Sequence, residues 1–248
     1  MEVHHHPKVD HGKRNFKEYF LEFIMIFLAV VLGFFAESIR ESINEQSREK
    51  EYILSLVQNL KEDTTNLDQA VEENIQKVEG MKKLMSLAFV DMSNDSNRRL
   101  LYKYCRGKSI GYYAIFKSND ATMLQLKTEG LRFIRKDHVA DTIAKYDNEL
   151  KVISAAEDLY NTAVETGILA TRDVLNYAIY YDSSFYRNGR FTSKLTPLVA
   201  DDPVKLKSMF NKVDLEIGAT ENYIYNLQIR QPFATRLINY LKQQYHIK

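Results

Sequence analysis

Four histidines near the N-terminus are the residues whose type and spacing best fit a metal-binding site: His4, His5, His6 and His11. Neutral imidazole nitrogens bind zinc, copper and nickel, and two or three of these rings could hold one ion if the segment folded back or if several chains met in an oligomer. A solvated tail explains the same residues, because a run of three histidines lacks the spacing of a known metal site. Both interpretations stay open on the sequence.

Two carboxylates flank a strongly apolar core segment, Glu22 before it and Glu37 after it. In a symmetric oligomer each would form a ring of negative charge, which is a way to attract cations to a pore. As single residues near the two faces of a bilayer they would only mark the ends of the segment, since a carboxylate can reach the headgroups there. The pair therefore predicts either a channel or an ordinary membrane boundary.

Signatures of catalysis are absent from the sequence, which contains no GxSxG, GxGxxG, P-loop or HExxH pattern. His138 stands beside Asp137 at an expected helix start, with Asp141 one turn on, but helix capping and solvation explain these residues better than acid–base work. Cys105 is the only cysteine, which excludes an intrachain disulfide and a CxxC motif. We therefore expect a protein that is not an enzyme and needs no cofactor.

Charge excludes a further class of function. Lys and Arg number 34 against 33 Asp and Glu, giving a net charge of +1. Proteins that bind nucleic acid generally carry a basic surplus, so we expect no nucleic acid as a partner.

The elements that must position these groups begin with an apolar run, FIMIFLAVVLGFFA, from Phe23 to Ala36. At 1.5 Å per residue this uncharged run spans about 21 Å of a bilayer core that is roughly 30 Å thick. Tyr19, Phe20 and Leu21 extend it past Glu22 and close most of the gap. The run predicts a transmembrane helix over residues 19–36.

Three other interpretations of this run fit less well. A cleaved signal peptide needs small residues before the cut, whereas this run ends in Phe34, Phe35 and Ala36. A buried core helix would show polar residues on one face, and a helix lying in the membrane plane needs a strongly polar face. The run is apolar all round, which favours a helix that spans the membrane.

Ala29 and Gly33 form a small-xxx-small pair inside this helix. Small residues four apart let two helix backbones approach closely in a membrane, so the pair predicts self-association.

Orientation follows from the basic residues near the two ends. Lys8, Lys13, Arg14 and Lys17 precede the run, and Arg40, Arg48 and Lys50 follow it. The positive-inside rule then predicts a basic, histidine-bearing cytoplasmic tail over residues 1–18, the membrane helix over 19–36 and an extracytoplasmic domain over 37–248.

The rest of the chain predicts an all-α fold, in which the transmembrane helix continues into a long helix and an antiparallel helical bundle follows. No proline occurs between Lys8 and Thr196, so long helices can form. Apolar residues recur in steps of three and four in three series, as in packed helices. The series are Ile53, Leu56, Leu60, Leu67, Val71, Ile75, Val78, Met81 and Met85; Val139, Ile143, Tyr146, Leu150, Ile153, Tyr160 and Val164; and Leu206, Phe210, Val213, Ile217, Ile224 and Leu227.

Boundaries between these helices come from breakers and caps. Residues 94–97 form the first break. Ser118, Asn119 and Asp120 can cap a short helix that runs to Gly130, and Asp137 caps the second long helix, which can continue through Ile179. Pro232 should kink the third long helix. Residues 110–116 are either a strand without an obvious partner or, as we expect, an ordered connector.

Two parts of the chain carry a resemblance to a known family. The segment MEVHHHPKVDHGKRNFKEYFLEFIMIFLAVVLGFFAESIRE with KEYILSLVQNLKED, and the later segment LQLKTEGLRFIRKDHVADTIAKYDNEL, resemble an uncharacterised family of single-pass membrane proteins of Bacteroidota. The resemblance is dense over residues 1–65 and 118–150. The family is classed as a domain of unknown function, so the resemblance implies a bacterial inner-membrane setting and no particular reaction.

The sequence thus predicts a membrane-tethered interaction protein, a scaffold or a sensor, whose partners are the lipid bilayer and either a second copy of itself or another envelope protein. The alternative is a homo-oligomeric ion channel in which the single membrane helix lines the pore.

Overall fold

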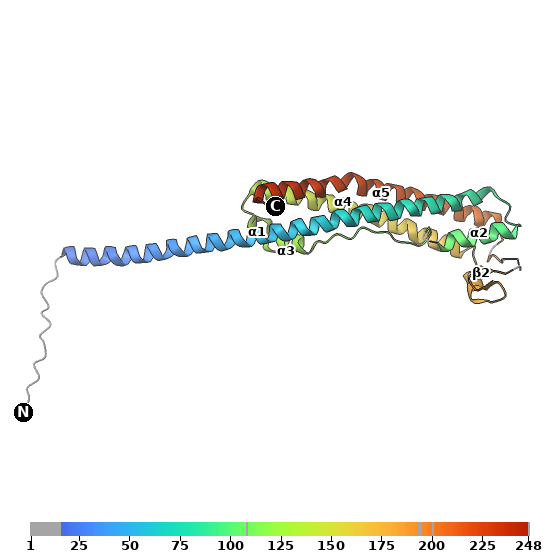
Figure 1. Ribbon diagram of the computed structural model, residues 1–248, viewed down its shortest axis with the longest axis horizontal. Coiled ribbons are helices and arrows are strands. Elements are labelled where there is room, and N and C mark those ends of the chain that lie inside the picture. The colour runs from blue at the N-terminus through green and yellow to red at the C-terminus, as the bar shows by residue number, and fades with distance from the viewer. Residues whose placement is uncertain (1–15, 108, 193–194, 200, 248) are drawn as a thin grey trace, which may run out of the picture. The chain divides into compact units, whose positions relative to one another are not determined.

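The computed structural model describes residues 16–107, 109–192, 195–199 and 201–247 (Figure 1). The described residues form an all-α protein, which confirms the predicted fold class. The α-helices are α1 (Phe16–Met85), α2 (Asp95–Arg106), α3 (Ala121–Glu129), α4 (Asp137–Arg172) and α5 (Pro203–Tyr245). Short 3-10 helices are η1 (Ser86–Phe89), η2 (Leu131–Phe133) and η3 (Tyr177–Tyr181), and strands β1 (Tyr186–Arg187) and β2 (Arg190–Phe191) form a small hairpin.

Helix α1 has 70 residues and contains both the apolar run and the first amphipathic series. No proline interrupts it, so the backbone hydrogen bonds continue from the apolar part into the amphipathic part. The predicted continuation of the membrane helix into a long helix is confirmed. The chain divides into two compact units, the first ending at Glu51 and the second beginning at Tyr52.

The second unit is a bundle of α4, α5 and the part of α1 from Tyr52 onward. Its buried apolar side chains form three clusters, and each cluster draws on all three helices. In order along α1 they include Leu56, Ile143 and Leu237; Leu67, Tyr160 and Leu227; and Met81, Ala170 and Val213. Residue numbers rise together along α1 and α4 and fall along α5, so α1 and α4 run in the same direction and α5 is antiparallel to both (Figure 1).

The parallel pair needs a return path, which η1, α2 and a connector between α2 and α3 provide. Residues 112–120 of this connector have no regular secondary structure. The expectation of a connector rather than a strand is therefore confirmed for these residues.

Local caps fix most boundaries, and three of them differ from the prediction. The first break lies before Asn94, whose side chain accepts a hydrogen bond from Ser96 N at 2.9 Å, so Asn97 is already helical. Asp137 is the first residue of α4 rather than its cap. Helix α4 ends at Arg172 instead of continuing through Ile179, because the chain turns there and pairs Leu175 with Leu198.

Two other boundaries match the prediction. Helix α3 begins after Asp120, although the Asp120 side chain makes no capping hydrogen bond, and it ends before Gly130. Gly130 has a φ of 87°, a backbone conformation that glycine adopts without strain. Pro232 lies inside α5, and the helix continues past it to Tyr245. The kink expected at Pro232 stays a prediction.

Candidate functional site

No side chain in the apolar part of α1 is buried, and all but Ile24 and Val31 are exposed. Its large side chains from Tyr19 to Phe35 include Leu28, which is 49% exposed, and Phe34, which is 74% exposed. Among the described residues α1 is the one helix long and apolar enough to span a membrane. The length and composition of the helix thus support the prediction that this segment can span a membrane.

The two small residues of this segment leave an open face on the helix. A Cβ atom added to Gly33 would meet nothing within 4 Å. At roughly 100° per residue, Ala29 and Gly33 lie on the same stripe of α1 as Glu22 and Arg40. A second helix could therefore approach this stripe closely without displacing a side chain of the same chain.

The two carboxylates predicted at the ends of the segment lie on exposed turns of α1. Glu37 is engaged within its own helix, because Arg40 contacts both of its oxygens, at 2.5 Å from Nη2 and 3.0 Å from Nε. A ring of Glu37 side chains would therefore be accompanied by a ring of arginines, which reduces the negative field expected of a cation pore.

The predicted histidine ligands His4, His5, His6 and His11 lie outside the described residues. Within the part of the chain that the structure describes, no group of three or more His, Cys, Asp or Glu side chains is placed to hold a metal ion. His138 lies against α5, where Nε2 is 3.3 Å from Oε1 of Gln244. The side chain is exposed and makes no cap to α4, so capping by His138 is not what the structure shows.

The most unusual chemistry of the second unit is an ion pair in its interior. Nζ of Lys77 on α1 lies 2.9 Å from Oε1 of Glu216 on α5, and both side chains are 0% exposed. Lys77 Nζ also donates hydrogen bonds to the carbonyl of Tyr112 at 2.8 Å and to the hydroxyl of Tyr160 at 3.3 Å. The ammonium therefore has three oxygen neighbours: two accept its hydrogen bonds, and the third belongs to the paired carboxylate.

Glu216 is accommodated by a glycine on the third helix. A Cβ atom added to Gly167 of α4 would lie 1.9 Å from Oε2 of Glu216, so any larger residue would displace the carboxylate. Oε2 accepts no hydrogen bond from the described residues. The pair therefore brings α1, α4 and α5 together at one level of the bundle.

Burial sets the protonation of this pair. Desolvation raises the pKa of Glu216 to about 7, although the nearby Lys77 ammonium favours the charged carboxylate. The same desolvation lowers the pKa of Lys77, against the pull of Glu216. The pair is thus an ionisable group of the interior whose carboxylate titrates near neutral pH.

A row of polar side chains on α1 satisfies the backbone of the connector. The donors are Asn66, Asn74 and Lys77, which bond the carbonyls of Lys117 at 2.9 Å, Ala114 at 2.6 Å and Tyr112 at 2.8 Å. Buried tyrosines of the other two helices accept from its amides: Tyr160 from Ala114 N at 3.1 Å and Tyr223 from Phe116 N at 2.9 Å. Side chains thus replace the partner strand that the sequence does not provide.

Asp63 on α1 anchors the far end of the same connector. Its carboxylate accepts hydrogen bonds from Asn119 N at 2.6 Å, Ser118 Oγ at 2.9 Å and Tyr146 Oη at 3.0 Å. Burial raises the pKa of Asp63 even though these three bonds favour the ionised form.

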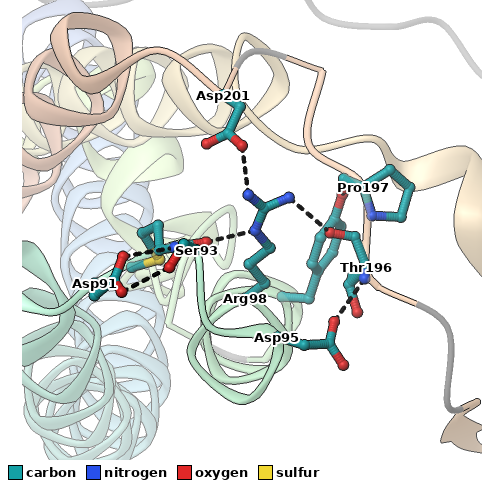
Figure 2. A network of polar contacts seen from close by, with 9 residues as sticks. Asp91, Ser93, Asp95, Arg98, Thr196, Pro197 and Asp201 are labelled. Carbon is teal, nitrogen blue, oxygen red and sulfur yellow. Dashed lines mark hydrogen bonds and ion pairs between the residues drawn. The ribbon is translucent and has the colours of Figure 1, made fainter.

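At the opposite end of the bundle, Arg98 of α2 joins two loops (Figure 2). Its Nε donates to the carbonyl of Met92 at 2.5 Å, Nη1 donates to the carbonyl of Thr196 at 3.3 Å, and Nη2 contacts the carboxylate of Asp201. Asp95 accepts from Thr196 N at 2.6 Å. These bonds hold the segment after β2 against α2.

Sequence reasoning did not single out Asn74, Lys77, Glu216 or Arg98. A signal for two of them was present, since positions 67, 70, 74, 77, 81 and 84 form a three-and-four stripe that is buried throughout. Asn74 and Lys77 are polar residues within that stripe, whereas Ile75, which we assigned to it, is exposed. A comparable signal was present for Glu216 as well, since positions 209, 213, 216, 220, 223 and 227 form a buried three-and-four stripe on α5. The sequence does not reveal the partners of these residues, because the partners are distant along the chain.

A comparison of the chain with protein-family models, with curated proteins and with solved structures found no match.

Proposed function

We propose that this chain is a non-enzymatic, membrane-anchored interaction protein, a scaffold or a sensor, of a bacterial inner membrane. In this proposal residues 1–18 lie in the cytoplasm and residues 19–36 span the bilayer. Residues 37–248 form a periplasmic helical domain that binds a second copy of the chain or another envelope protein. The resemblance to a family of Bacteroidota membrane proteins supports the bacterial setting, and the basic residues before Tyr19 support the orientation.

The observation that carries the proposal is the exposed apolar stretch of α1. Burying one large apolar side chain is worth about 1.5–3 kcal/mol, so a stretch of this length left in water would cost roughly 20 kcal/mol or more. A helix of 18 residues is about 27 Å long, close to the thickness of a bilayer core. Lipid is the environment that removes this cost along the entire length of the stretch.

A topology and fractionation experiment tests the anchor. We expect the full chain to stay in the membrane fraction after alkaline carbonate washing. A reporter that is active only outside the cytoplasm should give signal when it is fused after Lys248. The double variant Leu28→Arg/Leu32→Arg should move the chain to the soluble fraction, because each arginine near the middle of a membrane helix costs about 2.5–3.5 kcal/mol.

Leu124→Arg is the matched control, since Leu124 is also exposed but lies on α3. This variant should remain in the membrane fraction. Release of the unmodified chain by carbonate would contradict the anchor, and a reporter active only at the N-terminus would reverse the orientation. Native mass measurement of the solubilised chain tests the interaction, which a bare monomer without copurified protein would contradict.

A further inference from the structure

A groove between α2 and the β-hairpin combines positive charge with aromatic rings. One wall carries Arg99, Lys103 and Arg106, which follow one another on one face of α2, and the other carries Tyr180, Tyr186 and Phe191. The groove has a volume of about 660 Å³, within the range of small-molecule sites. No Asp or Glu is among its lining residues, all of which the structure describes.

Charge is segregated toward this groove although the whole chain is nearly neutral. No Asp or Glu occurs from Ser96 to Asn119, a stretch with six Lys and Arg residues, and none occurs from Ser183 to Ala200, a stretch with three. The first stretch contains the basic wall and the second contains the hairpin. A wall of one sign beside apolar rings concentrates the electric field and favours an anion.

The cations of the groove differ in how far they are already engaged. Arg99 contacts Asp95 and the carbonyl of Thr192, and the guanidinium of Arg106 lies 3.8 Å from the ring centroid of Tyr180. Lys103 is exposed and makes no hydrogen bond or ion pair with the described residues. Its ammonium is therefore available to a ligand.

The walls are held in place by bonds within the domain, so the groove is formed before any ligand arrives. The hydroxyl of Tyr102 on α2 donates to the carbonyl of Pro197 at 2.6 Å and accepts from Asn176 N at 2.7 Å. The hydroxyl of Tyr180 donates to the carbonyl of Tyr102 at 3.3 Å. Asn188 and Gly189, with φ of 52° and 78°, make the tight turn of the hairpin.

We infer that this groove binds an organic anion in which a phosphate or carboxylate is attached to a planar ring. Arginine and lysine hold the anionic group, since guanidinium and ammonium donors form strong charge-assisted hydrogen bonds to both groups. The planar ring lies against the aromatic wall, where offset or edge-to-face contacts add to apolar burial. The site goes beyond membrane anchoring and does not depend on it.

The test uses the full chain in phosphatidylcholine nanodiscs and four probes in titration calorimetry. Adenosine 5′-monophosphate and nicotinate each join a planar ring to an anion, adenosine has the ring without the charge, and ribose 5-phosphate has the charge without the ring. We expect one or both of the ring-bearing anions to bind, and the other two probes to bind at least tenfold more weakly. If only adenosine 5′-monophosphate binds, the anionic group of the ligand is a phosphate. If only nicotinate binds, the anionic group is a carboxylate.

Two variants assign the binding to the groove. Lys103→Gln should weaken binding about tenfold, the typical effect of losing one hydrogen bond to a charged group. It breaks no hydrogen bond or ion pair with the described residues, so circular dichroism should show an unchanged fold. Lys61→Gln removes an exposed lysine of α1 as a matched control and should bind like the unmodified chain. The inference would be overturned if neither ring-bearing anion bound, or if adenosine or ribose 5-phosphate bound equally well. An unchanged affinity in Lys103→Gln would overturn it too.

Discussion

At the scale of single residues, Lys77 and Glu216 place opposite charges in an interior position that solvent does not reach. Removing two ions from water costs several kcal/mol each, and their attraction offsets this cost only with good geometry and additional hydrogen bonds. Lys77 has these bonds, whereas neither carboxylate oxygen of Glu216 accepts a hydrogen bond from the described residues. The pair therefore adds little to stability as a whole, although each charge depends strongly on the other.

The raised pKa of Glu216 predicts a stability that falls as pH rises. The carboxyl has an ordinary pKa of 4.5 when exposed and one of about 7 in the folded chain, so the folded state binds its proton more tightly. The resulting stability is present below pH 4.5 and is lost as pH rises through 7, by roughly 3 kcal/mol over the whole range. We expect urea unfolding of the full chain in nonionic detergent, followed by tyrosine fluorescence, to show this fall between pH 5.5 and 8.

Two variants separate this effect from other titrations. Glu216→Gln has no carboxyl to titrate, so its free energy of unfolding should stay level or rise over the same pH range, as Lys77 loses its proton more readily. Lys77→Met/Glu216→Met removes both charges and should show a level profile at a stability close to that of the unmodified chain. A fall of the same size in all three proteins would show that other groups cause it.

At the scale of elements, the sequence predicted what local patterns control. Three-and-four spacing located the long helices, and the absence of proline allowed α1 to continue from its apolar part into the bundle. Gly130 marked the end of α3 because few other residues adopt its backbone conformation. Each of these features depends on residues within one or two turns of each other.

What the sequence did not predict depends on partners that are distant along the chain. The connector is held by Asn74 and by Tyr223, which lies 107 positions from its partner Phe116. The ion pair likewise joins residues on α1 and α5, and the groove joins α2 to the hairpin. A single sequence gives the spacing of residues on one helix, but not which helices become neighbours.

The association face of α1 gives a prediction at the same scale. Gly33→Leu should weaken self-association in the membrane by about 1 kcal/mol or more, because a bulky side chain keeps two backbones apart. Within one chain the new side chain meets open space, so the fold of the monomer should not change. Val31→Ala is the control, since at roughly 100° per residue position 31 lies on the side of the helix opposite Ala29 and Gly33. An in-membrane dimerisation assay that gave equal signals for all three proteins would leave α1 as an anchor only.

At the scale of the whole molecule, the chain divides between Glu51 and Tyr52 into a unit whose described residues form no buried apolar cluster and a unit that is stabilised by such clusters. The second unit buries three apolar clusters, and every cluster uses side chains of α1, α4 and α5. Loss of one helix would open all three clusters together, which favours a single cooperative unfolding transition. The apolar part of α1 contributes no residue to these clusters.

The last prediction follows from this separation. Residues 37–248, expressed without the apolar stretch, should be soluble without detergent and predominantly helical, because the three clusters and the side chains that hold the connector are all retained. Far-ultraviolet circular dichroism measures the helix content, and thermal unfolding should give one transition. The full chain, treated in the same way, should require detergent. Aggregation of the fragment, or a spectrum dominated by sheet, would mean that the bundle needs the apolar part of α1 in order to fold, and the chain could then not be described as a self-sufficient helical domain attached to a membrane helix.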